Sequence, residues 1–420
     1  MTTKAVRMYG KKDLRLEEFE LPPIGDDEIR AHIISDSICM SSYKAAVQGS
    51  DHKRVPSDID KNPVMIGHEF CGEIVAVGSK WKGKFKEGAR FSIQPALNYK
   101  GTLDAPGYTY RYIGGDATYV NIPNEVMEMD CLLEYTGEAF FMGSLAEPLS
   151  CVAGAFHANY HTTQGKYDHY MDVVDGGKMA LLAGVGPMGL CAIDYAIHRE
   201  RRPKTLVITD IDEKRLARAE SIYTKEHAAE HGVDIHYVNT KDMNDPEKHL
   251  IDLSGGTGYD DVFAFAPVRP VVEQADKILG KDGCLNFFAG PTDPQFSALF
   301  NFYNVHYASH HVVGTSGGNT DDMIEALDLM SRGVVNPVAM ITHVGGLNAV
   351  PETTLTLPQI PGGKKLMYTN IELPLTAIEE FEEKGKSEPM FKRLAEITSA
   401  NNGLWSAEAE RYLLENAESI

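Results

Sequence analysis

Positive charge is scarce in this chain of 420 residues. It has 60 Asp and Glu against 40 Lys and Arg, which gives a formal net charge of −20. Nucleic acids and anionic membrane surfaces are bound through basic surfaces, so this balance argues against both as partners. A small anionic substrate remains compatible with it, because such a substrate needs only one local basic group.

Long uninterrupted hydrophobic segments are also missing. The longest apolar runs, such as MALLAGVGPMGLCAI at residues 179–193, contain glycine and proline and are shorter than the ~20 residues that cross a bilayer. The first residues, MTTKAVRMYGKKDL, lack the hydrophobic core of a secretory signal. We therefore expect no membrane span and a cytoplasmic protein.

Cysteine is sparse and never forms a C-x-x-C pair. The six cysteines are scattered along the chain at Cys39, Cys71, Cys131, Cys151, Cys191 and Cys284. In a large chain without a secretory signal, this scatter favours reduced thiols over a disulfide framework. A single cysteine of this kind is usually a small buried hydrophobe.

Short β-branched segments separated by Gly, Pro and Asp turns dominate residues 1–125, as in DEIRAHIISDSI, GEIVAVGS, GARFSIQP and ATYVNIP. This spacing predicts a compact all-β unit. Residues 143–160 are expected to form a helix, with Pro148 in a first turn.

From Gly176 onward, predicted strands alternate with predicted helices. KMALLAGVGPMGLCAIDYAIHRE reads as strand, glycine turn and helix, TLVITD as a second strand, and DEKRLARAESIYTKEHAAEHG as a second helix. Such alternation predicts right-handed crossovers and a parallel sheet. The last segment, SAEAERYLLENAESI, is expected to be a solvated surface helix with Ser406 as its N-cap.

The predicted fold class is therefore α/β: a β-rich domain, an inserted α/β domain and a C-terminal return to the first. We expect the three parts to be residues 1–160, residues 161–315 and residues 316–420.

A glycine pattern, G-x-G-x-x-G, occupies Gly184, Gly186 and Gly189 between a predicted strand and a predicted helix. The first glycine permits a tight turn, the second lets backbone N–H groups approach a pyrophosphate, and the third allows close packing of helix on strand. Together with Pro187 and Met188, these residues are predicted to bind a dinucleotide.

Asp210 ends the next predicted strand, at roughly the offset of the acidic residue that accepts both ribose hydroxyls. Because a carboxylate there repels a 2′-phosphate, we expect NAD(H) rather than NADP(H), although Lys214 and Arg215 could soften this discrimination. A methyltransferase can use a related glycine turn. Such an enzyme would not need the Cys, His and Glu residues of the first domain that are typical metal ligands.

Metal-ligand chemistry is present at three places: Cys39 in DSICMSSYK, the pair His68 and Glu69 in IGHEF, and Glu147 in LAEPLSC. Thiolate, imidazole and carboxylate together fit a tetrahedral Zn²⁺ that keeps one position open. Each also has a structural explanation when taken alone, as a core cysteine, a hydrogen-bonded polar residue or a carboxylate at a helix start.

In combination, these motifs resemble the zinc-dependent medium-chain dehydrogenases. The shared features are GHE before a glycine-rich strand, an upstream Cys with Ser two residues later, E-P-L, and the glycine pattern after it. The resemblance covers nearly the whole chain. Within that superfamily the sequence looks most like the L-sorbose-1-phosphate reductases, on segments such as GSLAEPLSCVAGAFHANYH, HHVVGTSGGNTDDM and IPGGKKLMYT.

The resemblance implies a GroES-like β domain and a Rossmann domain with a doubly wound parallel sheet, with zinc and nicotinamide between them. It implies Cys39, His68 and a carboxylate as ligands of one catalytic zinc. Either Glu69 or Glu147 could be that carboxylate, and the two could exchange during turnover. By analogy, the strand in VHYASHHVVGTSG, residues 305–317, implies a dimer or tetramer.

The sequence departs from this family in two places. Residues 92–119 lack the four cysteines that many relatives carry, so no structural zinc is expected. Lys44 stands where relatives often have the histidine of a proton relay, whereas Ser41 keeps the relay hydroxyl.

The implied reaction is reversible hydride transfer. Zinc would polarise a ketone, NADH would deliver hydride, and Ser41 or a zinc-bound water would supply the proton, with Glu69 tuning the metal. The implied substrate is L-sorbose 1-phosphate, reduced to D-glucitol 6-phosphate. Alternatives are an unphosphorylated polyol or secondary-alcohol dehydrogenase, and a non-catalytic NAD-binding protein on the same fold.

Lys44 is the residue we expect to meet a substrate phosphate, because it lies near the metal-type residues in sequence and a point charge suits a phosphate. An exposed, solubilising role is the competing interpretation. Lys364 and Lys365 are weaker candidates, expected at the surface or on the cofactor side.

Overall fold

All residues from 1 to 420 are described by the computed structural model, and the chain divides into two units. Unit 1 consists of residues Met1–Glu147, Ala326–Ser331 and Ile341–Ile420, and unit 2 of Pro148–Glu325 and Arg332–Met340. The C-terminal part of the chain thus returns to the unit that the N-terminal part begins.

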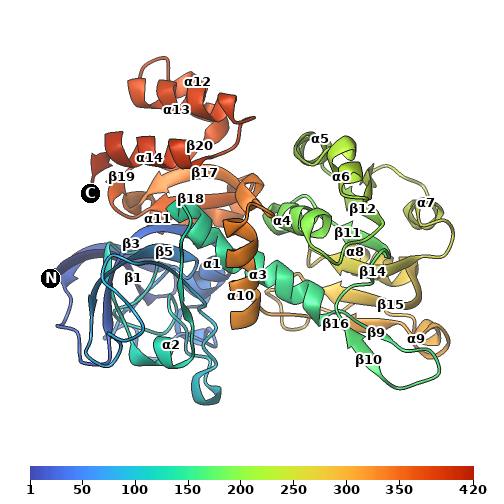
Figure 1. Cartoon of the computed structure of the whole chain (residues 1–420), viewed down its shortest axis with the longest axis horizontal. Helices are drawn as coiled ribbons and strands as arrows, with labels where there is room; N and C mark the ends of the chain where they lie inside the picture. Colours follow the sequence, from blue (N-terminus) through green and yellow to red (C-terminus); the bar gives the residue numbers. More distant parts are fainter. The chain divides into compact units, whose positions relative to one another are not determined.

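An eight-stranded sheet forms the centre of unit 1 (Figure 1). Its strand order is β20-β17-β18-β3-β5-β6-β8, and β7 also pairs with β3. The strands are β3 (Ile29–Ile38), β5 (Phe70–Val77), β6 (Arg90–Ile93), β7 (Tyr119–Ile122), β8 (Leu132–Glu134), β17 (Ile341–Gly346), β18 (Lys364–Tyr368) and β20 (Thr376–Ala377). Because β18 pairs with β3, the C-terminal segment is built into the N-terminal sheet.

Two smaller sheets complete unit 1. One has the order β2-β1-β4, and the other pairs β19 with β21. Their strands are β1 (Thr2–Gly10), β2 (Asp13–Glu20), β4 (Val64–Met65), β19 (Ile371–Glu372) and β21 (Glu418–Ser419). The helices of unit 1 are α1 (Met40–Gln48), α2 (Asn124–Glu128), α11 (Val350–Thr356), α12 (Phe381–Lys384), α13 (Pro389–Ala400) and α14 (Ala407–Asn416).

Unit 2 contains a six-stranded parallel sheet of order β13-β12-β11-β14-β15-β16, which confirms the predicted parallel sheet. The strands are β11 (Lys178–Leu182), β12 (Thr205–Asp210), β13 (Asp234–Asn239), β14 (Tyr259–Ala264), β15 (Leu279–Phe287) and β16 (His311–Val313). In sequence order this is 3-2-1-4-5-6, the doubly wound arrangement in which the order reverses beside the first strand. A ligand is expected at the carboxyl ends of the strands at that reversal.

Helices connect these strands (Figure 1). They are α4 (Pro187–His198), α5 (Glu213–Ile222), α6 (Lys225–Glu230), α7 (Pro246–Leu253), α8 (Arg269–Ile278) and α9 (Phe302–Ala308). Two further helices, α3 (Phe140–Ala158) and α10 (Thr320–Ser331), each contribute residues to both units.

Three details of the predicted helices are wrong. Pro148 lies in the interior of α3 rather than in its first turn. The single helix predicted after Asp212 is two helices, because the Thr224 side chain accepts a hydrogen bond from His227 N and starts α6 separately. The terminal helix α14 has Ser406 as its N-cap, as predicted, but it is not a simple surface helix. Its residue Glu410 is buried and accepts hydrogen bonds from Phe140 N and Phe141 N at the start of α3.

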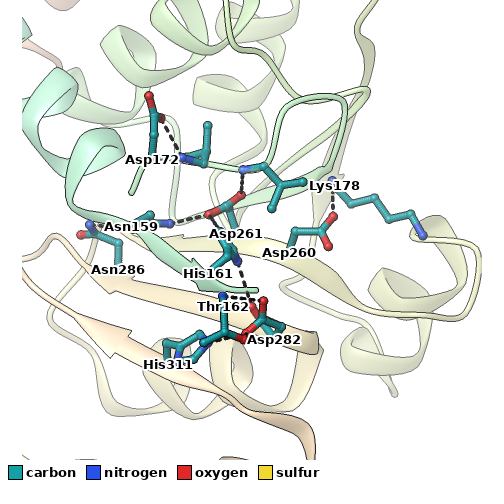
Figure 2. Close-up of polar contacts among 12 residues, drawn as sticks. Asn159, His161, Thr162, Asp172, Lys178, Asp260, Asp261, Asp282, Asn286 and His311 are labelled. Carbon is teal, nitrogen blue, oxygen red and sulfur yellow. Dashed lines mark hydrogen bonds and ion pairs between the residues drawn. The ribbon is translucent and has the colours of Figure 1, made fainter. Parts of the chain in front are cut away.

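A buried polar cluster holds the hairpin of β9 (Tyr160–Thr162) and β10 (His169–Met171) onto the sheet of unit 2 (Figure 2). The Asp261 carboxylate accepts hydrogen bonds from Asn159 Nδ2 at 2.7 Å and from Val174 N at 2.9 Å, and lies 3.1 Å from His161 Nε2. Burial by itself lowers the pKa of His161. The hydrogen bonds to Asp261 and Asp282 and the negative charges of these two residues together outweigh burial, so the pKa is raised. The cluster is explained as structural support, because the side-chain polar atoms of Asn159, His161 and Asp261 all have partners within the protein.

None of the helices combines the length and the apolar character that a membrane span requires. All six cysteines are free thiols in the structure.

Candidate metal centre and nucleotide turn

Three strand ends of unit 1 meet where the metal-type residues lie. Strand β3 runs antiparallel to both β5 and β18, so its carboxyl end lies beside the starts of the other two. Cys39 directly follows β3, Glu69 directly precedes β5, and Lys364 is the first residue of β18. The sheet therefore gathers three chemically active side chains from distant parts of the sequence.

Gly67 shapes the approach of the GHE segment. Its φ of +89° lies in the left-handed region, and an added Cβ would lie 2.5 Å from Asp116 N and 2.8 Å from Asp36 Oδ2. Only glycine fits both the backbone and the space. The next two residues, His68 and Glu69, are thereby placed at the start of the strand, and both are buried.

Cys39, His68 and Glu69 lie close together in space. Their ligand atoms all lie within 4.8 Å of one another. Cys39 is the N-cap of α1, and the Ser41 hydroxyl in the first turn of that helix donates a hydrogen bond to Cys39 Sγ at 3.0 Å. The same hydroxyl lies 3.1 Å from His68 Nε2. Ser41 is thus in contact with two of the three residues.

Both ring nitrogens of His68 have hydroxyl partners. Ser42 Oγ lies 3.2 Å from Nδ1, and Tyr108 OH lies 3.2 Å from Nε2. The Tyr108 ring also packs against the imidazole, with 4.9 Å between ring centroids. Burial lowers the pKa of His68, which favours the neutral imidazole that binds metals.

Glu69 is held by Lys364. The Lys364 ammonium donates hydrogen bonds to both carboxylate oxygens, and Ser37 Oγ donates to one of them. Burial by itself raises the pKa of Glu69, but the charges of Lys364 and His68 and the hydrogen bonds from Lys364 and Ser37 together outweigh burial and lower the pKa. Glu69 is therefore an ionised carboxylate inside the protein.

The expectation that Lys364 and Lys365 lie at the surface is wrong. Lys364 is 5% exposed and Lys365 is 1% exposed. Both stand in β18, which pairs with β3 over residues 365–368, and Lys365 Nζ donates to the carbonyl oxygens of Pro361 and Gly363. Burial arises here from strand pairing across more than 300 residues of sequence, which no local pattern reports.

Glu147, in α3, is buried beside the same cluster. Its pKa is raised to about 7, chiefly by burial and then by the negative charge of Glu69, while His68 opposes the shift. The Glu147 carboxylate is therefore close enough to Glu69 and His68 for their charges to shift its pKa. It is not one of the three whose ligand atoms lie within 4.8 Å of one another.

A buried carboxyl pair, Asp36 and Asp116, lies behind the cluster. Asp36 Oδ1 accepts a hydrogen bond from Glu69 N at 3.0 Å. Burial raises the pKa of both carboxyls, to about 7 for Asp116. Sequence reasoning did not identify these residues, because neither stands in a recognisable motif.

Basic side chains also lie close to the ring of Tyr108. The Arg54 guanidinium lies 5.7 Å from the Tyr108 ring centroid, and the His52 ring stacks on it at 5.7 Å. The pKa of His52 is lowered by burial and then by the charges of Arg54, Lys53 and Lys44. This set of positive charges stands out in a chain of net charge −20.

Lys44 lies half-buried on α1. Burial lowers the pKa of its ammonium, and the charge of Cys39 opposes that shift. The lysine is therefore near the metal-type cluster in space as well as in sequence.

The donor set fits a divalent metal ion. Burial raises the pKa of the Cys39 thiol, so a thiolate at this position needs a nearby cation, and the ammonium of Lys364 is already paired with Glu69. A zinc ion would supply that charge while accepting neutral His68.

The glycine turn of unit 2 connects β11 to α4. Gly184 N donates to Thr209 O at 2.9 Å, which ties the turn to the end of β12. A Cβ on Gly189 would lie 2.2 Å from Gly184 O, so this position must be glycine for the helix to pack. A Cβ on Gly186 would meet nothing within 4 Å, which leaves open space at the start of α4. Pro187 is the first residue of α4, and Met188 follows in its first turn.

Asp210 lies at the carboxyl end of β12, next to this turn. Its Oδ1 accepts hydrogen bonds from Ile211 N at 2.8 Å and Asp212 N at 3.0 Å, which fixes the carboxylate at the strand end. Arg215 is engaged with Asp212, whose side chain caps α5.

Comparison with known proteins places both units among dehydrogenases. Residues 25–130 match the alcohol dehydrogenase GroES-like domain, and residues 187–332 match the zinc-binding dehydrogenase family. The mannitol-1-phosphate 5-dehydrogenase of Aliivibrio fischeri is 53% identical over 414 residues, covering 99% of this chain and 97% of the relative. The L-sorbose 1-phosphate reductase of Klebsiella pneumoniae is 51% identical over 419 residues, covering 100% and 99%.

Among solved structures, the 2R,3R-butanediol dehydrogenase of Bacillus subtilis superposes with a TM-score of 0.71 at 22% identity, over 88% of this chain and 100% of that one. At this identity the match shows a shared fold, which agrees with the two units described above.

Proposed function

Because this chain belongs to the zinc-dependent medium-chain dehydrogenase superfamily, we propose that it is a zinc- and NAD(H)-dependent ketose-phosphate reductase. The first candidate reaction is the reduction of L-sorbose 1-phosphate to D-glucitol 6-phosphate. A phosphorylated substrate is supported by one observation. Lys44, Lys53 and Arg54 place positive charges around His52, next to the metal-type residues. We assign the catalytic role to unit 1 and the nucleotide-binding role to unit 2.

We assign Cys39, His68 and Glu147 as the residues that would hold the zinc ion, with Glu69 behind it. Both oxygens of Glu69 already accept hydrogen bonds from Lys364, so this carboxylate is neutralised by the protein. One thiolate and the Glu147 carboxylate would then balance the two charges of the ion. Zinc bound there would act as a Lewis acid on the substrate carbonyl.

Ser41 is the residue we assign to proton transfer. Its hydroxyl contacts both Cys39 and His68, so it lies beside the residues that would hold the metal and would be placed to pass a proton to the substrate oxygen. The Tyr108 hydroxyl contacts His68 Nε2, and the Tyr108 ring packs against the rings of both His68 and His52. We assign Tyr108 to positioning His68.

Comparing the two candidate forms of the substrate tests this proposal. The kcat/KM for L-sorbose 1-phosphate with NADH is expected to exceed that for L-sorbose by at least about 100-fold, because two charge-assisted contacts to a phosphate contribute about 1.5–3 kcal/mol each. Equal values for the two sugars would instead favour an unphosphorylated polyol or secondary-alcohol dehydrogenase.

Replacing Arg54 tests the phosphate site itself. Arg54→Gln is expected to raise KM for L-sorbose 1-phosphate by about 10–100-fold and to leave kcat/KM for L-sorbose unchanged. Arg111→Gln is the matched control, because the Arg111 guanidinium also lies over a tyrosine ring, that of Tyr112, but the residue is exposed. An equal loss of kcat/KM for both sugars would show that Arg54 does not bind the phosphate.

Mannitol 1-phosphate is a second candidate substrate. The support is the relative named for it, which is as similar to this chain as the sorbose 1-phosphate reductase is. Oxidation of mannitol 1-phosphate and of D-glucitol 6-phosphate by NAD, measured side by side, ranks the two candidates. The basic cluster is compatible with both, since either substrate carries a phosphate.

NAD(H) is the proposed cofactor because Asp210 ends β12 beside the glycine turn. Asp210→Ala is expected to change the ratio of kcat/KM for NADH over NADPH by at least about tenfold in favour of NADPH, since the charge that repels a 2′-phosphate is lost. Asp212→Ala is the control, because Asp212 caps α5 two residues later. An unchanged ratio in Asp210→Ala would remove Asp210 from this role.

We further propose a cytoplasmic homo-oligomer, a dimer or tetramer. Support comes from the edge strand β16 and the neighbouring α9, whose large side chains are exposed. They are Phe302 at 76%, Tyr303 at 68%, Tyr307 at 66% and Val312 at 51%. Light scattering that gives the mass of one chain would contradict the oligomer.

A further inference from the structure

Three histidines of unit 2 converge on one point outside the sites described above. His198 is the last residue of α4, His227 lies in α6, and His231 directly follows α6 as its C-cap. The ring centroids are 4.6–5.0 Å apart, and one ring nitrogen from each lies within 4.8 Å of the others. From these contacts we infer a second metal site, built from three imidazoles, that binds a borderline divalent ion of the Zn²⁺ or Ni²⁺ class.

Local structure brings the three rings together. His227 and His231 are four residues apart, so they lie on the same face of α6. The Arg202 guanidinium donates to Ile197 O at 3.4 Å and to His231 O at 3.2 Å, which ties the end of α4 to the end of α6. The third ring, His198, is thereby held against the other two.

A buried carboxylate orients His198. Asp194 is 3% exposed, and its Oδ1 lies 2.8 Å from His198 Nδ1, while its backbone carbonyl oxygen lies 2.9 Å from the same nitrogen. Asp194 Oδ2 is itself held by Asn336 N at 2.7 Å. With two acceptors on Nδ1, that nitrogen carries the hydrogen, and Nε2 presents its lone pair to the other rings. Carboxylate behind histidine is the arrangement that fixes metal-binding histidines in proteins.

The closest approach in the cluster is 2.8 Å, between Nε2 of His198 and Nε2 of His227. Two lone pairs at that distance repel each other, so either a proton or a cation must lie between them. A metal ion would replace the proton after a small opening of the pair, with His231 as the third ligand. The rings are half-buried, so water can fill a fourth position.

Imidazole ligands select the metal class, because three neutral nitrogens without a thiolate suit Zn²⁺, Ni²⁺ or Cu²⁺ rather than Mg²⁺ or Ca²⁺. His198 lies eleven residues after Pro187 in α4, about 16 Å along the helix from the glycine turn. We therefore assign the ion a structural role, joining α4 to α6 in the nucleotide-binding unit, and no part in hydride transfer.

Metal counting on the untagged full chain tests this inference. The protein is incubated with ZnCl₂, freed of loose metal by gel filtration, and analysed by mass spectrometry. Wild type is expected to hold two ions per chain, and His227→Ala and His231→Ala one each. Added ZnCl₂ is expected to raise the melting temperature of unit 2 by about 5 °C in wild type and not in these variants.

Two controls keep this result separate from the proposed function. His236→Ala removes a histidine of the same unit whose side chain pairs with Asp234, and it should keep the wild-type count. Cys39→Ser should lose the ion of unit 1 and keep the ion of the histidine cluster. With Co²⁺, the thiolate charge-transfer band should survive in His227→Ala and vanish in Cys39→Ser.

The inference is overturned if His227→Ala and wild type hold the same number of ions, or if ZnCl₂ stabilises both equally. Either result would show that a proton, in an N–H···N hydrogen bond, occupies the space between the two Nε2 atoms. Failure of the proposed function would look different: wild type would hold one ion, Cys39→Ser would also hold one, and His227→Ala none.

Discussion

Replacing Lys364 with methionine is expected to destabilise unit 1 by about 3–5 kcal/mol, because it leaves the Glu69 carboxylate buried without its cation. Glu69 is 1% exposed and Lys364 is 5% exposed, so water cannot take the place of the ammonium. The effect is measured as the shift of the urea midpoint for unfolding of unit 1. The double variant Lys364→Met with Glu69→Gln is expected to be more stable than Lys364→Met alone, since the unpaired charge is gone.

Lys365→Met is the matched control for this pair. Lys365 is equally buried in the same strand, but its Nζ donates to the carbonyl oxygens of Pro361 and Gly363. Its loss is expected to cost about 1–3 kcal/mol through unpaired neutral acceptors. Adding Glu69→Gln should not rescue that variant. Rescue of both lysine variants alike, or of neither, would show that the ion pair with Glu69 is not what makes Lys364 important.

Cys39→Ser is expected to lower zinc content and kcat/KM together, the latter by at least about 100-fold. Residues that merely support a metal ligand cost 10–100-fold when replaced, so loss of a direct ligand should cost more. Zinc per chain, measured by mass spectrometry alongside steady-state kinetics, gives the result. His68→Ala should behave in the same way, because His68 is the other proposed ligand in the same group of close ligand atoms.

Cys151→Ser is the control for thiol loss in general, since Cys151 is half-buried, forms no disulfide and is not among the residues of the metal-type cluster. It should retain both zinc and activity. Full activity of Cys39→Ser without metal would rule out the zinc mechanism, and the nucleotide turn would then have to support a different chemistry.

Local sequence patterns predicted most of the secondary structure and the family. The family is confirmed, because the GHE, E-P-L and glycine motifs depend on residue types at short spacing. The parallel sheet of unit 2 is confirmed for the same reason, since alternating strand and helix can form only a few topologies. The helix break at Thr224 was missed, because the segment on both sides of it has good helix formers and the capping hydroxyl decides the boundary.

Long-range contacts account for the rest of the candidate site. Tyr108 lies 40 residues from His68 in sequence, and Lys364 lies 295 residues from Glu69, so neither partner could be read from a motif. Arg54, His52 and His68 all lie against the ring of Tyr108, which brings the basic residues close to the metal-type residues. The three histidines of unit 2 were also missed, although the spacing of His227 and His231 is a local signal that could have drawn attention to a helix face.

Short segments of the sequence specify the chemical types: a thiol, an imidazole and carboxylates in the first domain, and a glycine turn with an acidic residue after it in the second. These properties need no knowledge of distant contacts. Which carboxylate is neutralised and which lysine is buried can be learned only from the folded chain. Charge and burial depend on partners from other strands, and the pairing of β18 with β3 brings a lysine from the end of the chain to the glutamate of IGHEF.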